Sequence, residues 1–102
     1  MGDRTKEVKR VKINGKDIDI VEATVVFYEE NGVIERYVLT FESKAAVREA
    51  WDWLEDNRKS PTVDVEFVLY DFAETYKGRS YISTTKTRLE YVVEGSSLER
   101  VQ

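Results

Sequence analysis

The sequence predicts a single α+β domain in which a mostly antiparallel, curved sheet packs on one amphipathic helix. Three observations carry this prediction. Two Asn-Gly pairs are typical of two-residue hairpin turns, a helical spacing of apolar residues fills the middle of the chain, and an alternating apolar pattern follows it. The predicted element order is therefore β-β-β-α-β-β. The domain spans residues 1–102, and its ends, residues 1–6 and 95–102, are interpreted as tails that can be flexible.

The first hairpin closes at Asn14-Gly15, because Asn and Gly both accept the positive φ that a tight turn requires. This turn sets opposite charges across from each other on one face of the hairpin and apolar residues on the other face. The predicted pairs are Ile13 with Lys16, Lys12 with Asp17, Val11 with Ile18, and Arg10 with Asp19.

The second hairpin closes at Asn31-Gly32. The strand before it is long, and its inward side changes near Val21 and Glu22, where we expect a bulge or a bend. The predicted register pairs Tyr28 with Glu35, Val26 with Tyr37, and Val25 with Val38. One face of the hairpin would then hold Ala23, Val25, Phe27 and Val38, and the other face Val26, Tyr37, Leu39 and Phe41.

One helix is predicted from Ser43, a good N-cap residue, to Ser60, because Pro61 disfavours a helical residue before it. Its apolar arc carries Trp51 and Trp53 at opposite rims, and acidic residues occupy the other side. The helix is therefore expected to cover one face of the sheet.

Two strands are predicted after the helix. The odd-numbered residues from Val63 to Leu69 form an apolar face, and Val68, Tyr70 and Phe72 form the other. The segment Lys77-Gly78-Arg79 is interpreted as the turn that follows, and a last strand runs from Ser80 to Val93.

The composition excludes several classes of site. The chain has no Cys and no His, so it cannot build a Cys/His zinc site, a thiol nucleophile or a Ser-His-Asp triad. Its glycines are isolated, which argues against a phosphate-binding loop. We therefore expect no enzyme activity, no cofactor and no metal. The first residues lack an apolar stretch, so the expected location is cytoplasmic and no membrane contact is predicted.

The main functional prediction is a protein-interaction or assembly module. The second hairpin is apolar on both faces, so the sheet must either curl around both or meet another chain. The predicted partner is a second copy of the chain, in a homodimer, or another protein of a larger complex. The size and the charged, cysteine-free composition fit a protein of a virus or a thermophile. The candidate interface residues are Trp51, Val25, Phe27 and Val38.

The alternative is a nucleic-acid-binding accessory protein. Both chain ends are basic and the middle is acidic, within a net charge of −4. A stretch rich in bases, Tyr, Ser and Thr near the C-terminus could contact phosphates and stack on bases. The candidate residues are Lys77, Arg79, Lys86, Arg88, Tyr76 and Tyr81.

A weaker alternative is a carboxylate-dependent hydrolase. Asp64 and Glu66 share one strand face, at a spacing that nucleases use. The residue two positions after Glu66 is Val68, however, where such a site needs a Lys to activate water. This pattern therefore predicts no catalytic residue.

Overall fold

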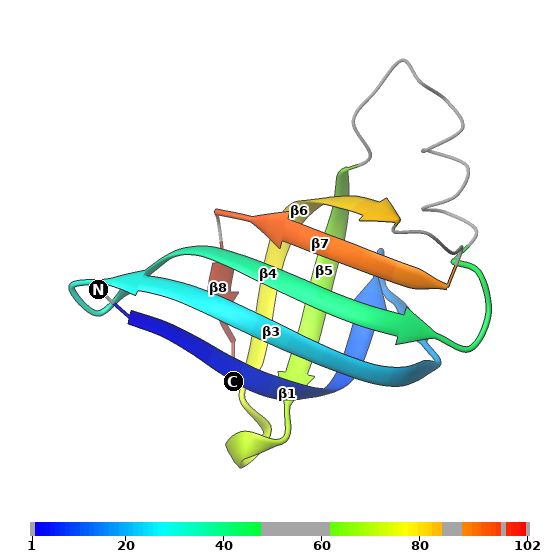
Figure 1. The fold of residues 1–102 in the computed structure, drawn as a ribbon, viewed down its shortest axis with the longest axis horizontal. Coiled ribbons are helices and arrows are strands. Elements are labelled where there is room, and N and C mark those ends of the chain that lie inside the picture. Colours follow the sequence, from blue (N-terminus) through cyan, green and yellow to red (C-terminus); the bar gives the residue numbers. More distant parts are fainter. Residues whose placement is uncertain (1, 48–61, 85–88, 97, 102) are drawn as a thin grey trace.

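The computed structural model describes residues 2–47, 62–84, 89–96 and 98–101, which form a closed antiparallel β-barrel of six strands (Figure 1). Around the barrel the order is β1-β3-β4-β7-β6-β5, and β5 pairs with β1 to close it. The short strands β2 and β8 pair with β1 and β6. The strands are β1 (Gly2–Ile13), β2 (Lys16–Ile18), β3 (Ile20–Glu30), β4 (Val33–Ser43), β5 (Thr62–Leu69), β6 (Thr75–Thr84), β7 (Glu90–Gly95) and β8 (Leu98–Arg100), and the 3-10 turn η1 (Asp71–Ala73) joins β5 to β6.

The predicted α+β architecture is wrong, because the strands of the described residues close into a barrel. A closed barrel turns the inner face of every strand toward one shared interior, so no helix is needed to cover that face. Most of the predicted helix, including Trp51 and Trp53, lies outside the described residues. Of the two explanations for the apolar second hairpin, a curled sheet or a partner chain, the closed barrel is an example of the first.

Bulges interrupt the strands β1 and β3. In β1, Val8 pairs with Leu69 and Arg10 pairs with Val68, so Lys9 is an extra residue without a partner on β5. At this bulge β1 leaves β3, with which its first half pairs, and continues beside β5. In β3 the register shifts between Ile20 and Glu22, which confirms the bulge predicted from the change of inward side.

The registers of the two Asn-Gly hairpins differ in how well the sequence predicts them. The first is confirmed from Ile13 with Lys16 to Val11 with Ile18, but the pairing ends there and does not include Arg10 with Asp19. In the second hairpin the prediction is wrong by one residue beyond the turn. Glu35 is an extra residue, so Tyr28 pairs with Arg36, Val26 with Val38 and Val25 with Leu39.

Because of this one-residue shift, most of the apolar residues that the predicted register placed on two faces lie on the same, inner face. Phe27 lies opposite Tyr37, and Ala23 lies opposite Phe41, all inside the barrel. Val26 and Val38 lie opposite each other on the outer surface and are half-buried. The barrel interior is formed by Val8, Val11, Ile13, Ala23, Val25, Phe27, Tyr37, Leu39, Phe41, Val63, Val65, Phe67, Leu69, Tyr76, Ile82, Tyr91 and Val93.

The C-terminal half also departs from the prediction. The segment around Gly78 is not a turn but the middle of β6, where Gly78 lies between Val65 on β5 and Leu98 on β8. The chain turns earlier, from Tyr70 to Glu74, and the last predicted strand is divided into β6 and β7. Both chain ends carry strands, since residues 2–7 pair with β3 and residues 98–100 pair with β6.

Candidate functional site

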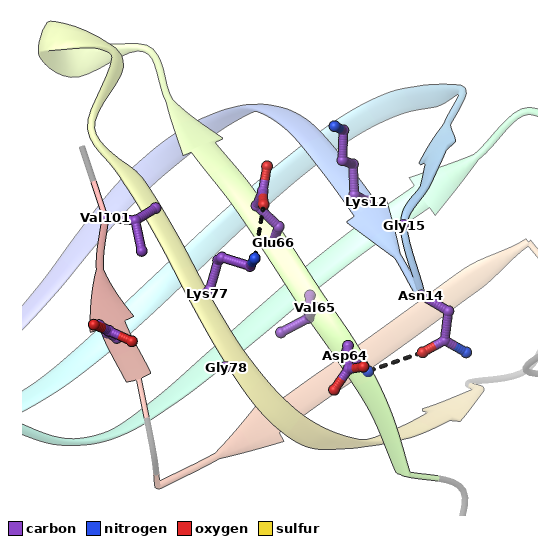
Figure 2. Close-up of a pocket in the computed structure, with 10 residues that line it drawn as sticks. Lys12, Asn14, Gly15, Asp64, Val65, Glu66, Lys77, Gly78 and Val101 are labelled. Carbon is purple, nitrogen blue, oxygen red and sulfur yellow. Dashed lines mark hydrogen bonds and ion pairs between the residues drawn. The ribbon is translucent and has the colours of Figure 1, made fainter.

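A groove of about 800 Å³ crosses the outer face of β5 and β6. The hairpin between β1 and β2 lies on one side of it and β8 on the other (Figure 2). Its lining residues are Lys12, Asn14, Gly15, Asp64, Val65, Glu66, Lys77, Gly78, Glu99 and Val101.

The hairpin wall of the groove is fixed by two hydrogen bonds. The Asn14 N–H donates to the carbonyl oxygen of Asp64 at 2.8 Å, and the Asp64 N–H donates to the side-chain oxygen Oδ1 of Asn14 at 3.0 Å. Asn14 can make both contacts because it takes the positive φ of the turn, +50°. The tip of the hairpin is therefore tied to β5.

A row of alternating charges runs across the groove floor. Lys12 pairs with Asp17 on one side and with Glu66 on the other, and Lys77 pairs with Glu66 and with Glu99. The Nζ atom of Lys77 lies 3.9 Å from Oε1 of Glu66. Directly opposed charges of opposite sign stabilise neighbouring strands. This charge row, Asp17–Lys12–Glu66–Lys77–Glu99, spans β2, β1, β5, β6 and β8.

The pairing of β5 with β6 brings together residues from two of the alternative functions. Nη1 of Arg79, a candidate phosphate contact, lies 3.6 Å from Oδ1 of Asp64, one of the two carboxylates of the hydrolase alternative. Lys77, another candidate phosphate contact, likewise lies beside Glu66, the second carboxylate of that alternative. Each base is thus offset by an acid on the next strand, which weakens the attraction for phosphate. Lys86 and Arg88 lie outside the described residues.

The two candidate tyrosines lie on opposite sides of the sheet. Tyr81 is exposed, whereas Tyr76 faces the interior, is 4% exposed and stacks on Phe67. The Tyr76 hydroxyl donates to Oε1 of Glu74 at 2.8 Å. Burial, followed by the hydrogen bond to Glu74, raises the pKa of Tyr76. Tyr76 is therefore placed for packing and not for stacking on a base.

The predicted interface residues that the structure describes do not share one face of the sheet. Val25 and Phe27 are 0% exposed inside the barrel, so contact with a partner would require the barrel to open. Val38 lies on the outer surface, and Trp51 lies outside the described residues.

The turn between β5 and β6 holds a feature that the sequence analysis missed. Phe72 is 94% exposed and has a φ of +53°, and Ala73 follows with a φ of +51°. Neither residue type favours this left-handed region. Tyr70, in the same turn, is 64% exposed. The sequence prediction extended the strand through Phe72 because Val68, Tyr70 and Phe72 alternate, and alternation cannot reveal where a strand ends.

Backbone and side-chain contacts hold this turn in place. The Leu69 N–H donates to the carbonyl of Glu74 at 2.9 Å, and the Tyr70 N–H donates to the carbonyl of Glu7 on β1 at 3.2 Å. Lys6 also binds Asp71, with 2.8 Å between Nζ and Oδ2. The turn projects beyond the end of the barrel (Figure 1). Tyr70 and Phe72 are therefore exposed on a turn that hydrogen bonds and an ion pair fix to the barrel.

A hollow of about 450 Å³ lies beside Phe72. It is lined by the bulged part of β1, the end of β5, the turn η1 and the start of β6, through Lys9, Arg10, Val68, Phe72, Ala73 and Thr75. Apolar and cationic side chains thus border the same space.

Comparison of the chain with protein families, with curated proteins and with solved structures finds no match. Among the residues that the structure describes, no three acidic side chains are grouped so that they could hold a metal ion. The described part of the chain contains no helix with the length and apolar character needed to cross a membrane.

Proposed function

We propose that this chain is a non-enzymatic protein-interaction module that meets its partner through the turn from Tyr70 to Ala73. One observation carries the proposal: a phenylalanine, Phe72, is almost fully exposed in a strained backbone conformation. Strain of this kind costs about 1–3 kcal/mol per residue and is concentrated at binding and active sites.

Folding alone gives no reason for a phenylalanine at this position. A left-handed turn residue is usually Gly, Asn or Asp, as at the Asn14 and Asn31 turns of this chain. Phe72 contributes almost nothing to the core, because it is 94% exposed. Aromatic side chains are, however, frequent among the residues that dominate binding energy at interfaces. Phe72 and Tyr70 therefore fit a contact surface better than a simple connection.

The partner is proposed to be another protein and not a second copy. The argument for a homodimer depended on an uncovered apolar sheet face, and the closed barrel leaves that face inside. The nucleic-acid alternative receives less support, because Lys77 and Arg79 lie beside Glu66 and Asp64. An electrophoretic shift of DNA that is lost in Lys77→Glu/Arg79→Glu would favour that alternative.

The experiment compares proteins captured from extracts of the source cells by immobilised wild-type chain and by Phe72→Ser. Val33→Ser is the matched control, since Val33 is also exposed and next to a hairpin turn. We expect one or more proteins to be lost with Phe72→Ser and retained with Val33→Ser, while circular dichroism shows both variants folded. Identical capture by all three would contradict the proposal.

A further inference from the structure

We infer that the hollow beside Phe72 binds an acidic segment of the partner, with an apolar side chain of that segment packed against Phe72. This inference rests on the proposed function and adds the chemistry of the partner. The hollow supplies two cations, Lys9 and Arg10, and an apolar surface formed by Val68, Phe72 and Ala73.

Lys9 and Arg10 have no carboxylate partner among the described residues, unlike three other bases. Arg4 is paired with Glu29, Lys6 with Asp71 and Arg100 with Glu74. Within the described residues, no carboxylate lies at ion-pair distance from Lys9 or Arg10. Their charges are therefore available to an incoming anion.

The bulge in β1 explains why both cations reach the outer surface. Side chains normally alternate between the two faces of a strand, so one of two neighbours would face inward. The extra residue, Lys9, interrupts this alternation, and Lys9 and Arg10 are both exposed. Beside them, Arg10, Val68 and Thr75 occupy one row across β1, β5 and β6. The cations and the apolar surface are thus held by three paired strands.

An acidic peptide fits this arrangement better than a nucleic acid or a lipid surface. Two cations suffice for one or two carboxylates, whereas a phosphate backbone needs many bases along a groove. The net charge of −4 opposes a long polyanion, such as a nucleic acid or an anionic lipid surface, more strongly than a short segment with one or two carboxylates. The single protruding Phe72 can anchor one apolar side chain.

The experiment measures binding of three fluorescent peptides by anisotropy at low salt. The first peptide carries one Phe among Asp and Glu residues, the second has Ser in place of that Phe, and the third has Asn and Gln in place of the acids. We expect the first to bind most tightly and its affinity to fall as salt is added, because salt screens exposed charges.

Charge reversal then locates the site. The double variant Lys9→Glu/Arg10→Glu should weaken binding of the first peptide at least about tenfold, and Phe72→Ser should weaken it by a similar factor. The control is Lys16→Glu/Lys44→Glu, which makes the same change in net charge at exposed residues that do not line the hollow. This control should bind as the wild type does.

Three results would overturn the inference. The first is that the two double variants bind the first peptide with equal affinity. The second is that the wild type does not bind this peptide. The third is that a DNA oligonucleotide or phosphatidylserine vesicles bind at Lys9 and Arg10 more tightly than the peptide does. In each case the capture experiment with Phe72→Ser still decides the proposed function separately. If Phe72→Ser loses captured proteins but the acidic peptide does not bind, the proposed interaction module is supported and the acidic partner is rejected.

Discussion

At the centre of the barrel, the hydroxyls of Tyr37 and Ser80 bind each other among apolar side chains. Tyr37 lies on β4 and is 0% exposed, and its partner in the register of β7 is Gly95. A side chain at Gly95 would point at Ser80, since a Cβ atom there would lie 2.8 Å from Oγ and 3.2 Å from Cβ of Ser80. The absence of a side chain at Gly95 therefore makes room for this buried polar pair.

We expect Gly95→Ala to lower the free energy of unfolding by about 1–3 kcal/mol, because the added methyl group overpacks the site. Chemical denaturation measures the loss. In a Ser80→Ala background the hydroxyl that the methyl group meets is gone, so Gly95→Ala should be less destabilising there. Equal losses in both backgrounds would show that the contact with Ser80 Oγ is not the cause.

The buried Tyr37 also predicts how stability depends on pH. Burial raises the pKa of its phenol well above the ordinary value of 10.0. Below pH 10 the phenol is protonated in both the folded and the unfolded chain, so its contribution is fully present. Above pH 10 the unfolded chain loses this proton first, so stability falls, by up to about 1.4 kcal/mol per pH unit.

Tyr37→Phe should therefore make the alkaline loss of stability shallower, although at neutral pH it leaves Ser80 without its partner and costs about 1–3 kcal/mol. Denaturant titrations at several alkaline pH values measure both effects. Some alkaline slope should remain, because burial raises the pKa of Tyr76 in the same direction. An unchanged slope in Tyr37→Phe would contradict the assignment.

At the scale of elements, the outer surface of the barrel carries two contrasting rows of charge. In the charge row, each acid lies opposite a base. On β3, β4 and β7 the corresponding row is Glu22–Glu42–Glu90, three acids directly opposite one another. Like charges in opposed positions destabilise a sheet, and unlike charges stabilise it.

The stability change expected for Lys77→Glu depends on whether Lys77 lies in a turn or in a strand. In an exposed turn, as the sequence predicts, Lys77→Glu would alter stability by less than about 0.5 kcal/mol. In the middle of β6 it would set three acids in line, so we expect a loss of about 0.5–1 kcal/mol. Lys44→Glu, outside the strands, is the control. Thermal denaturation at low salt should show the difference, and added salt should reduce it.

The opposite effect is expected at Glu42. Glu42→Gln removes the middle charge of the acidic row and should raise the free energy of unfolding by about 0.2–1 kcal/mol. Glu35→Gln, at the bulge of β4, makes the same chemical change without two acids in register beside it. If both variants have the same stability, repulsion within the row is not significant.

For the whole molecule, closure of the barrel decides the oligomeric state that we expect. The pairing of β1 with β5 closes the barrel around Val25 and Phe27, two of the residues from which a homodimer was predicted. Light scattering at micromolar concentration should therefore report a mass near 11.9 kDa. A stable dimer would be near twice that mass, and it would require an interface of about 1,200–2,000 Å² on the outside of the barrel. Such a dimer, dispersed by Phe72→Ser, would identify a second copy as the partner.

The sequence by itself determined the local features of this protein. Asn14-Gly15 and Asn31-Gly32 make turns because both residues accept a positive φ, and these residues do so in the structure. The change of inward side near Val21 predicted a bulge, and the alternation from Val63 to Leu69 predicted a buried face. Each of these features depends on residues close together in the chain.

The tertiary structure alone decided the closure of the barrel and the position of the candidate sites. Alternation shows which residues share a face, but closure requires β1 and β5 to meet, and bulges at Lys9 and Glu35 shift the register without a sequence signal of their own. The separate acidic and basic candidates became neighbours for the same reason: Asp64 meets Arg79 only because β5 and β6 pair. Phe72 is exposed because the chain must reverse after Leu69 to make that pairing.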